Sequence, residues 1–339
     1  MSVSYVSPGR VSRVSPGHAA LHLARAASLA PSPHNSQPWL FAEEGHDHGF
    51  EVHLQGGRRM ILTDPGGREA VIACGAALFN VRIAVRGLGF QPVVDLLPEP
   101  GNSGFLARVG YGTHAPATPE ETLLARAMPR RHTHRGPFGP DPVPDALLDD
   151  LSAQAWTEGA VLQVIDEPEK LRLLADLVRT AEDLQRADPR QAAEIIRSAG
   201  PDGVPVGACR HHPDATPLAG RDYLGFAQYC IRPRRRWAGR TGTVAVLATP
   251  YDSRTDWLRA GQALQRVLLH AAAHDVMAAF HTQPLELPSL RAEIRTHLVG
   301  GRFPQVVLRL GRAPHTWGTR RRPHAEVLLH DGVPVRWRR

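Results

Sequence analysis

The sequence predicts an α+β fold made of two related halves, each a small, mostly antiparallel sheet flanked by helices. The chain has 339 residues, more than the roughly 100–200 residues of one ordinary domain. Short apolar stretches of strand length alternate with longer ones at helical spacing. The stretch GAALFNV that begins at Gly75 is echoed by GQALQRV at Gly261. This internal echo favours a duplicated unit, with chance similarity as the alternative.

The first half is predicted to span residues 1–118. It opens with a helix over 18–29 that ends at the Pro31/Pro33 pair, because proline lacks an amide donor and restricts the residue before it. A long helix with one broad apolar stripe lies in its middle, closed by Gly87 and Gly89. The predicted strands and this helix cover 39–41, 50–54, 68–88, 92–97 and 105–109.

The second half is predicted to span residues 119–339. Its expected helices are 119–128, 144–155, 167–187, 189–198, 254–274 and 288–298, and its expected strands are 160–165, 243–249, 276–280 and 304–310. In both halves the long helix and a strand precede a segment ending in Arg-x-Gly, at 108–110 and at 309–311. Residues 200–242 are rich in Gly, Pro, Arg and His without a sustained period, so we expect a lid there.

The charge of the chain is basic but diffuse. The formal net charge is +7 and the pI about 10.0, yet Lys170 is the only lysine and the arginines are spread over the whole length. A biased coding composition explains such a spread as well as a binding surface does. No helix-turn-helix, aromatic platform or zinc-finger pattern accompanies the charge, so we expect no nucleic-acid partner.

Cysteines and the N-terminus indicate a cytoplasmic protein without a membrane partner. The three cysteines, Cys74, Cys209 and Cys230, show no CxxC spacing, which favours a reducing compartment. The first residues are polar and lack the apolar core of a secretory signal. No stretch approaches the roughly 18 consecutive apolar residues of a membrane helix.

The stretch APSPHNSQPW at 30–39 is the strongest chemical signal. Ser32, His34, Asn35 and Gln37 supply hydroxyl, imidazole and amide groups on a backbone stiffened by three prolines. A loop preset in this way can present donors and acceptors to the edge of a flat heteroaromatic ring at little ordering cost. The simpler interpretation is a proline-rich turn between a helix and a strand.

Two arginine-rich segments follow. In RRHTHRGPF at 130–138, forked guanidinium donors flank a hydroxyl, the combination that a phosphate monoester prefers. A solvated basic loop is the alternative. The triplet at 320–322 precedes Pro323 and is either a second source of phosphate ligands or part of a charged tail.

These segments resemble the FMN-dependent nitroreductase family. A helix that ends in APSxxNxQPW before a strand is typical of that family, and 130–138 resembles its RRSxRxF opening. The resemblance implies that the chemistry takes place on FMN N5, with no catalytic side chain and no metal. It implies these cofactor-binding residues: Pro31, Ser32, His34, Asn35, Gln37, Arg131, Thr133, Arg135, Gln283, Arg320 and Arg321.

The motifs are divided between the halves, since the first has the loop and the second has the phosphate arginines. This division, the CGAALFN helix and the late RRP resemble the two-halved Acg branch of the family. The resemblance implies one FMN per chain, in a monomer that acts as an intramolecular pseudo-dimer. In that branch the excursion corresponding to 200–242 folds over the flavin, and reductase activity can be absent.

We therefore expect ping-pong hydride transfer from NAD(P)H through FMN to a nitroaromatic compound or a quinone. The alternative is an FMN-storing protein with a lidded flavin and little NAD(P)H-dependent activity. A zinc site at His270 and His274 lacks the HExxH glutamate and a third ligand. Neither GxGxxG after a strand, nor a Walker loop, nor a GxSxG elbow is present.

Overall fold

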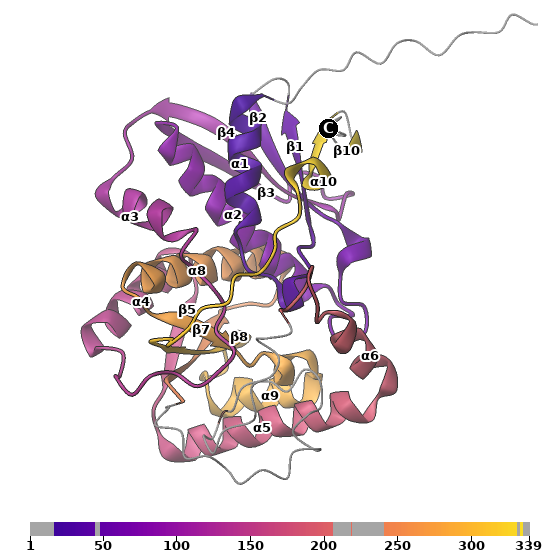
Figure 1. The fold of residues 1–339 in the computed structure, drawn as a ribbon, viewed down its shortest axis with the longest axis vertical. Helices are drawn as coiled ribbons and strands as arrows, with labels where there is room; N and C mark the ends of the chain where they lie inside the picture. Colours follow the sequence, from indigo (N-terminus) through magenta and orange to yellow (C-terminus); the bar gives the residue numbers. More distant parts are fainter. Residues whose placement is uncertain (1–16, 45–47, 206–217, 219–240, 331–332, 335–339) are drawn as a thin grey trace, which may run out of the picture.

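Two sheets and their helices meet along one pair of long helices. The computed structural model describes residues 17–44, 48–205, 218, 241–330 and 333–334, and most of the expected lid at 200–242 lies outside the described residues. Figure 1 shows the first half above and the second half below, with α2 (Arg68–Gly87) and α8 (Arg254–Ala273) between the two sheets. The predicted α+β class with two sheets is confirmed.

The first sheet has the strand order β10-β9-β1-β2-β4-β3. Its strands are β1 (Trp39–Glu44), β2 (Gly49–Leu54), β3 (Phe90–Leu96), β4 (Phe105–His114), β9 (Leu328–His330) and β10 (Val333–Pro334). Helix α1 (His18–Ser28) and α2 cover it. All predicted elements of this half are present, with ends that differ by at most five residues.

The second sheet has the order β5-β6-β8-β7. Its strands are β5 (Val161–Ile165), β6 (Thr243–Thr249), β7 (Met277–Phe280) and β8 (Phe303–Gly311). The other helices are α3 (Pro119–Ala127), α4 (Asp145–Thr157), α5 (Pro168–Ala187), α6 (Pro189–Arg197), α9 (Pro288–His297) and α10 (His324–Val327). Three 3₁₀ turns, η1 (Pro33–Asn35), η2 (Gly56–Arg58) and η4 (Gln283–Glu286), and the elements after residue 323 were not predicted.

The two sheets share one topology. The run β1-β2-β4-β3 in the first corresponds to β5-β6-β8-β7 in the second, and every neighbouring pair within these runs is antiparallel. The two Arg-x-Gly segments lie on the corresponding strands β4 and β8. The echo seen in the sequence therefore falls on equivalent positions of the fold.

The C-terminal part of the chain returns to the first half. Residues 312–323, which we call the C-terminal strap, leave the second sheet and rise in yellow past α1 in Figure 1. Strand β9 then pairs in parallel with β1, with Phe41 opposite Leu328. The expected boundary at 118/119 falls between β4 and α3, but the last strands of the second segment complete the sheet of the first.

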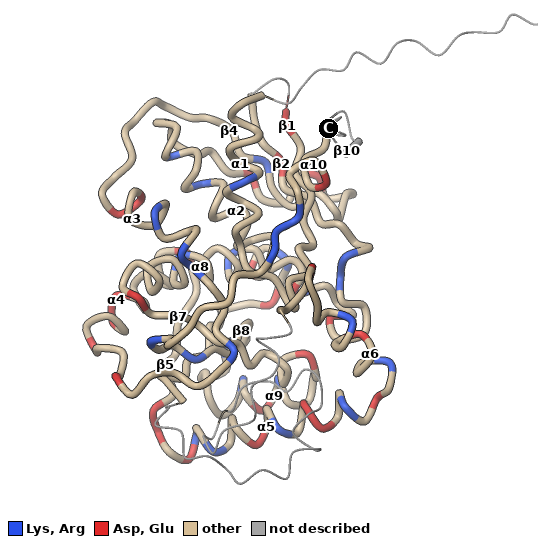
Figure 2. Tube along the Cα trace, in the orientation of Figure 1, with Lys and Arg blue, Asp and Glu red and all other residues tan. Residues whose placement is uncertain are grey.

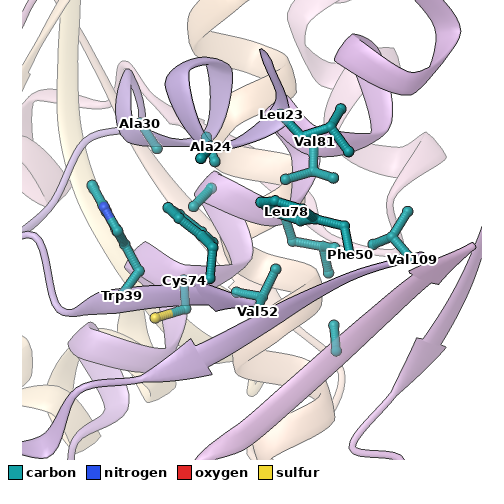
Figure 3. Packing of buried hydrophobic residues seen from close by; sticks show 14 of the residues in the cluster. Leu23, Ala24, Ala30, Trp39, Phe50, Val52, Cys74, Leu78, Val81 and Val109 are labelled. Atoms are coloured by element: carbon teal, nitrogen blue, oxygen red, sulfur yellow. The ribbon is translucent and has the colours of Figure 1, made fainter. Parts of the chain in front are cut away.

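The core of the first half lies between its sheet and α2. Trp39, Phe50 and Leu78 are fully buried there, and Figure 3 shows them converging from β1, β2 and α2. Inward and outward residues alternate along β1, as expected for a sheet with one buried face. Burying such side chains contributes about 1.5–3 kcal/mol each.

Helix α2 is long and apolar enough to cross a membrane by length and composition, but 89% of its most apolar window is buried inside the protein. A core helix passes the same test. Cys74 on this helix is buried as a free thiol, and burial raises its pKa.

A close crossing of α2 and α8 joins the halves, and it is made by the two glycines of the echo. A Cβ on Gly75 would lie 2.4 Å from the Leu258 carbonyl oxygen, and one on Gly261 would lie 2.0 Å from the Ile72 carbonyl oxygen. Real Cβ atoms do not approach backbone so closely, so only glycine allows this distance between the helix axes.

We expect Gly261→Ala to lower the free energy of unfolding by about 3 kcal/mol, because the added methyl group must push two backbones apart. Thermal and urea unfolding followed by circular dichroism measure this. The matched control is Gly87→Ala, at the exposed end of α2, where a Cβ meets nothing within 4 Å. Equal stability of the two variants would contradict the close crossing.

Candidate functional site

A cleft of about 900 Å³, open solvent included, lies where the two halves meet. One wall is the loop after α1, and the opposite wall comes from β8 and from the segment between β7 and η4. Its lining residues are Pro31, Ser32, Pro33, His34, Glu69, Ile72, Ala73, Thr133, His134, Arg135, Leu264, Ala279, Phe280, His281, Thr282, Gln283, Glu286, Gln305, Val306 and Arg309.

The loop after α1 is held in an unusual conformation. His34, Asn35 and Gln37 have φ angles of 49°, 61° and 49°, in the left-handed region that residues with a Cβ seldom adopt. The Gln37 amide donates to Ser32 Oγ at 2.9 Å, and the Asn35 amide donates to the Ser32 carbonyl oxygen at 3.1 Å. Such strain persists only where the surroundings fix it, and it clusters at functional sites.

The side chains of Asn35 and Gln37 do not line the cleft. Asn35 Nδ2 donates to the carbonyl oxygens of Arg320 and Asp202 at 2.9 and 3.0 Å. Gln37 Oε1 accepts from the Arg322 amide at 2.8 Å. The side-chain amides of Asn35 and Gln37 therefore bind the C-terminal strap to the loop. They do not contact the space inside the cleft.

Three arginines gather behind the loop: Arg131, Arg135 and Arg321. Arg131 and Arg321 both donate to the Leu29 carbonyl oxygen at 3.3 Å, and Arg321 donates to Asn35 Oδ1 at 2.8 Å. None of the three forms an ion pair with a carboxylate among the described residues. In Figure 2 the strap carries a continuous blue stretch before it enters α10, whereas α5 carries mixed charges.

Burial and mutual repulsion act together on this cluster. Burial lowers the pKa of Arg131 to about 9, with the charges of Arg321 and Arg135 adding to the shift. Burial, and then Arg135, lowers the pKa of Arg321 to about 10. The buried Nε atoms of all three have no hydrogen-bond partner in the described part of the chain. Uncompensated guanidinium groups with unused donors are what an oxoanion such as a phosphate needs.

The structure gathers most of the predicted site residues at one place. Pro31, Ser32, His34, Thr133, Arg135 and Gln283 line the cleft. Arg131 and Arg321 lie directly behind its loop wall. Arg320 does not line the cleft. Its side chain is 74% exposed, and its Nη1 lies 3.6 Å from Asp202 Oδ1.

Sequence reasoning missed Arg309 and His281. Arg309 on β8 is 1% exposed, and its Nε donates to His281 Nε2 at 2.8 Å. Because a guanidinium is a donor only, this bond fixes His281 Nε2 as an acceptor. The Arg-x-Gly echo marked the position of Arg309, but its partner on the equivalent strand, Arg108, lies near the surface beside Glu44 and Glu51. The echo alone gave no sign that one of the two is buried.

Helices α5 and α6, and Ser198 just after α6, form hydrogen bonds with residues in and around the cleft. Gln283 Nε2 donates to Glu182 Oε1 at 3.0 Å, and Gln185 on α5 donates to Glu286. Further along, Glu194 on α6 accepts from the Thr63 amide at 3.0 Å, and Ser198 Oγ lies 3.1 Å from His34 Nδ1. The segment from α5 to residue 205 thus contacts both halves through polar groups.

No group of three possible metal ligands occurs among the described residues. The rings of His270 and His274 lie 4.8 Å apart on α8.

The chain is similar in sequence to proteins that carry the nitroreductase name. No family model matches the chain. A Mycobacterium tuberculosis protein provisionally named an NAD(P)H nitroreductase is 31% identical over 296 residues, which cover 85% of this chain and 83% of that protein. The protein provisionally named NAD(P)H nitroreductase Acg, of the same organism, is 30% identical over 311 residues, 89% of this chain and 92% of its own length.

Among solved structures, a nitroreductase with bound FMN from Desulfitobacterium hafniense is similar at a TM-score of 0.41 and 12% identity. The match covers 62% of this chain and 98% of that one.

We expect inorganic phosphate to stabilise the ligand-free protein through the three arginines. At about 100 times its Kd, phosphate should add about 2.7 kcal/mol of stability relative to chloride of equal ionic strength. The Arg131→Gln variant should lose most of this response, whereas Arg179→Gln, in an exposed ion pair on α5, should keep it. Thermal melts in matched phosphate and chloride buffers measure this stabilisation. If phosphate stabilised the Arg131→Gln variant fully, the arginine cluster would not be the phosphate site.

We also expect Asn35→Ala to loosen the C-terminal strap. The substitution removes the bonds to the Arg320 and Asp202 carbonyl oxygens and leaves alanine at a φ of 61°. Trypsin should then cut faster after Arg320 and Arg321, as followed by mass spectrometry of the released C-terminal fragment. Ser36→Ala is the control, because Ser36 has an ordinary φ of −60°. An unchanged cleavage rate in the Asn35 variant would show that other contacts hold the strap.

Proposed function

The chain belongs to the nitroreductase family, and from this premise we propose that it binds one FMN in the cleft and passes hydride from NAD(P)H to nitro compounds or quinones. The cluster of Arg131, Arg135 and Arg321 is the observation that carries the proposal. Its buried, unused donors fit a phosphate monoester, the anionic end of FMN.

The remaining lining residues fit the rest of the cofactor. Pro31 to His34 form a preset wall, which suits a flat ring because no ordering is needed on binding. Across the cleft, Ile72, Ala73 and Leu264 supply small and apolar surface. Thr133 adds a neutral hydroxyl beside Arg135. Asn35 and Gln37 act indirectly, by fastening the strap that carries Arg321.

Bound FMN would supply the redox chemistry, since its N5 accepts a hydride from a reduced nicotinamide and delivers it to an acceptor. The protein's part is to bind, to orient and to exclude water. Arg309 and His281 place a fixed positive charge and a fixed tautomer at the cleft. A buried positive charge favours the gain of electron density nearby, as flavin reduction requires.

We propose one flavin site per chain, formed within a pseudo-dimer of two halves. The shared topology and the paired glycines support the duplication. The position equivalent to the flavin loop follows α4, and there Glu158 lies 2.6 Å from Arg82 and 3.3 Å from Arg266. These paired charges line the position that would be the second site. Residues 1–118 and 119–339 remain our proposed halves, and the lid proposed at 200–242 lies mostly outside the described residues.

We expect the purified protein to be yellow and NADPH to bleach it in the absence of oxygen. Addition of a quinone or a nitroaromatic compound should then restore the flavin absorption band, as a ping-pong cycle requires. A yellow protein that NADPH does not bleach would instead support FMN storage. A colourless protein after expression with ample riboflavin would refute both.

The phosphate assignment has its own test. Replacing Arg131 and Arg135 with Ala should weaken FMN binding at least about a hundredfold, because two charge-assisted hydrogen bonds are lost. Fluorescence titration of the apoprotein with FMN measures the change. Arg179→Ala with Arg186→Ala, two exposed arginines of α5, is the matched control. Unchanged flavin occupancy in the cleft variant would overturn the assignment.

A further inference from the structure

A second groove, of about 1340 Å³ with open solvent included, lies between α1, α2 and the end of α3. Its surface is mainly apolar, because hydrophobic residues packed between these helices are exposed along it. Ala26, Leu29, Ile83, Ala84 and Met128 contribute to it. The groove and the cleft have no lining residue in common, although Arg321 of the arginine cluster lines the groove.

The ionisable residues that line this groove are all basic, and Ser28 is its one neutral polar lining residue among those described. His22 and Arg25 on α1, Arg321 and Arg322 on the strap, and His324 on α10 are present, and none of the described lining residues is acidic. Arg25 is exposed and forms no ion pair with a carboxylate of the described residues. Arg322 is paired with Glu326, with 3.5 Å between Nε and Oε2, so the free positive charge of the rim is carried mainly by Arg25 and Arg321. An apolar surface with such a basic rim is complementary to a molecule that has an aliphatic body and an anionic head.

We propose that this groove binds one free fatty acid, with its chain on the apolar surface and its carboxylate at the basic rim. The chain would remove apolar area of both partners from water, which is the favourable part of such binding. The carboxylate would meet Arg25, whose charge has no other partner in the described structure.

Gly87 keeps one end of the groove open. It is the last residue of α2 and lines the groove, and a Cβ there would meet nothing within 4 Å. A large side chain at this position would fill empty space without pressing on the core. The position therefore offers a blocking variant that leaves the fold intact.

Calorimetric titration of the full-length protein with dodecanoate, kept below its micelle concentration, tests the proposal. We expect one site, and an affinity that rises about tenfold from decanoate to dodecanoate because two more methylene groups are buried. Dodecyltrimethylammonium has the same chain and the opposite charge. It should bind at least about tenfold more weakly than dodecanoate.

Variants locate the binding. Gly87→Phe should abolish dodecanoate binding, while Gly87→Ala should retain it. Arg25→Glu should weaken binding about tenfold or more. Arg126→Glu is the charge-matched control, since Arg126 is an exposed arginine of α3 that does not line the groove. Thermal melts of each variant report whether the fold is kept.

Four results would overturn the proposal: no dodecanoate binding, equal binding of the ammonium detergent, binding unaffected by Gly87→Phe, or binding to anionic vesicles without binding of monomeric dodecanoate. The last result would mean that the basic rim meets a lipid surface. All readouts are heats of binding and melting temperatures, so they do not depend on whether the protein has reductase activity.

Discussion

The contact of α2 with α8 at Gly75 and Gly261 is the constraint on which the rest of the structure depends. With no side chain at either position, the two helix backbones approach until a Cβ would overlap a carbonyl oxygen. This distance fixes how the two sheets lie relative to one another. The cleft is formed by the loop after α1 on one side and by β7, η4 and β8 on the other, so its width follows from the same crossing.

The arginine cluster places buried positive charges close together, which is unfavourable in the absence of a ligand. Burial lowers the pKa of Arg131 and of Arg321, and the charge of Arg135 adds to both shifts. The described residues provide no carboxylate that pairs with either arginine. Burying charge without a partner is costly unless a ligand supplies the counter-charge. The strap and the strained loop hold the cluster in place through Asn35 and Gln37, so packing elsewhere in the protein maintains a site that would otherwise relax.

The two sheets share a topology but differ at equivalent positions. Arg108 on β4 lies opposite Glu51 and Asp95 in the sheet register, while Arg309 on β8 lies opposite Val244 and Ala279. Neutral neighbours leave Arg309 to bond with His281 and to face the cleft. Acidic neighbours keep Arg108 at the surface. The arginine of the Arg-x-Gly segment therefore forms surface ion pairs on β4 and lines the cleft on β8.

The sequence by itself predicted most of the helices and strands, the α+β class with two sheets, and six of the residues that line the cleft. Periodicity placed the helices and strands because apolar side chains must face one core, and the motifs at 30–39 and 130–138 were local enough to be recognised. Only the tertiary structure decided the rest. That Asn35 and Gln37 turn toward the strap, that β9 joins β1 and that Arg309 is buried all depend on contacts between residues far apart in the chain. The order of residues along the chain does not show these contacts, because they form only when the helices, sheets and strap pack together.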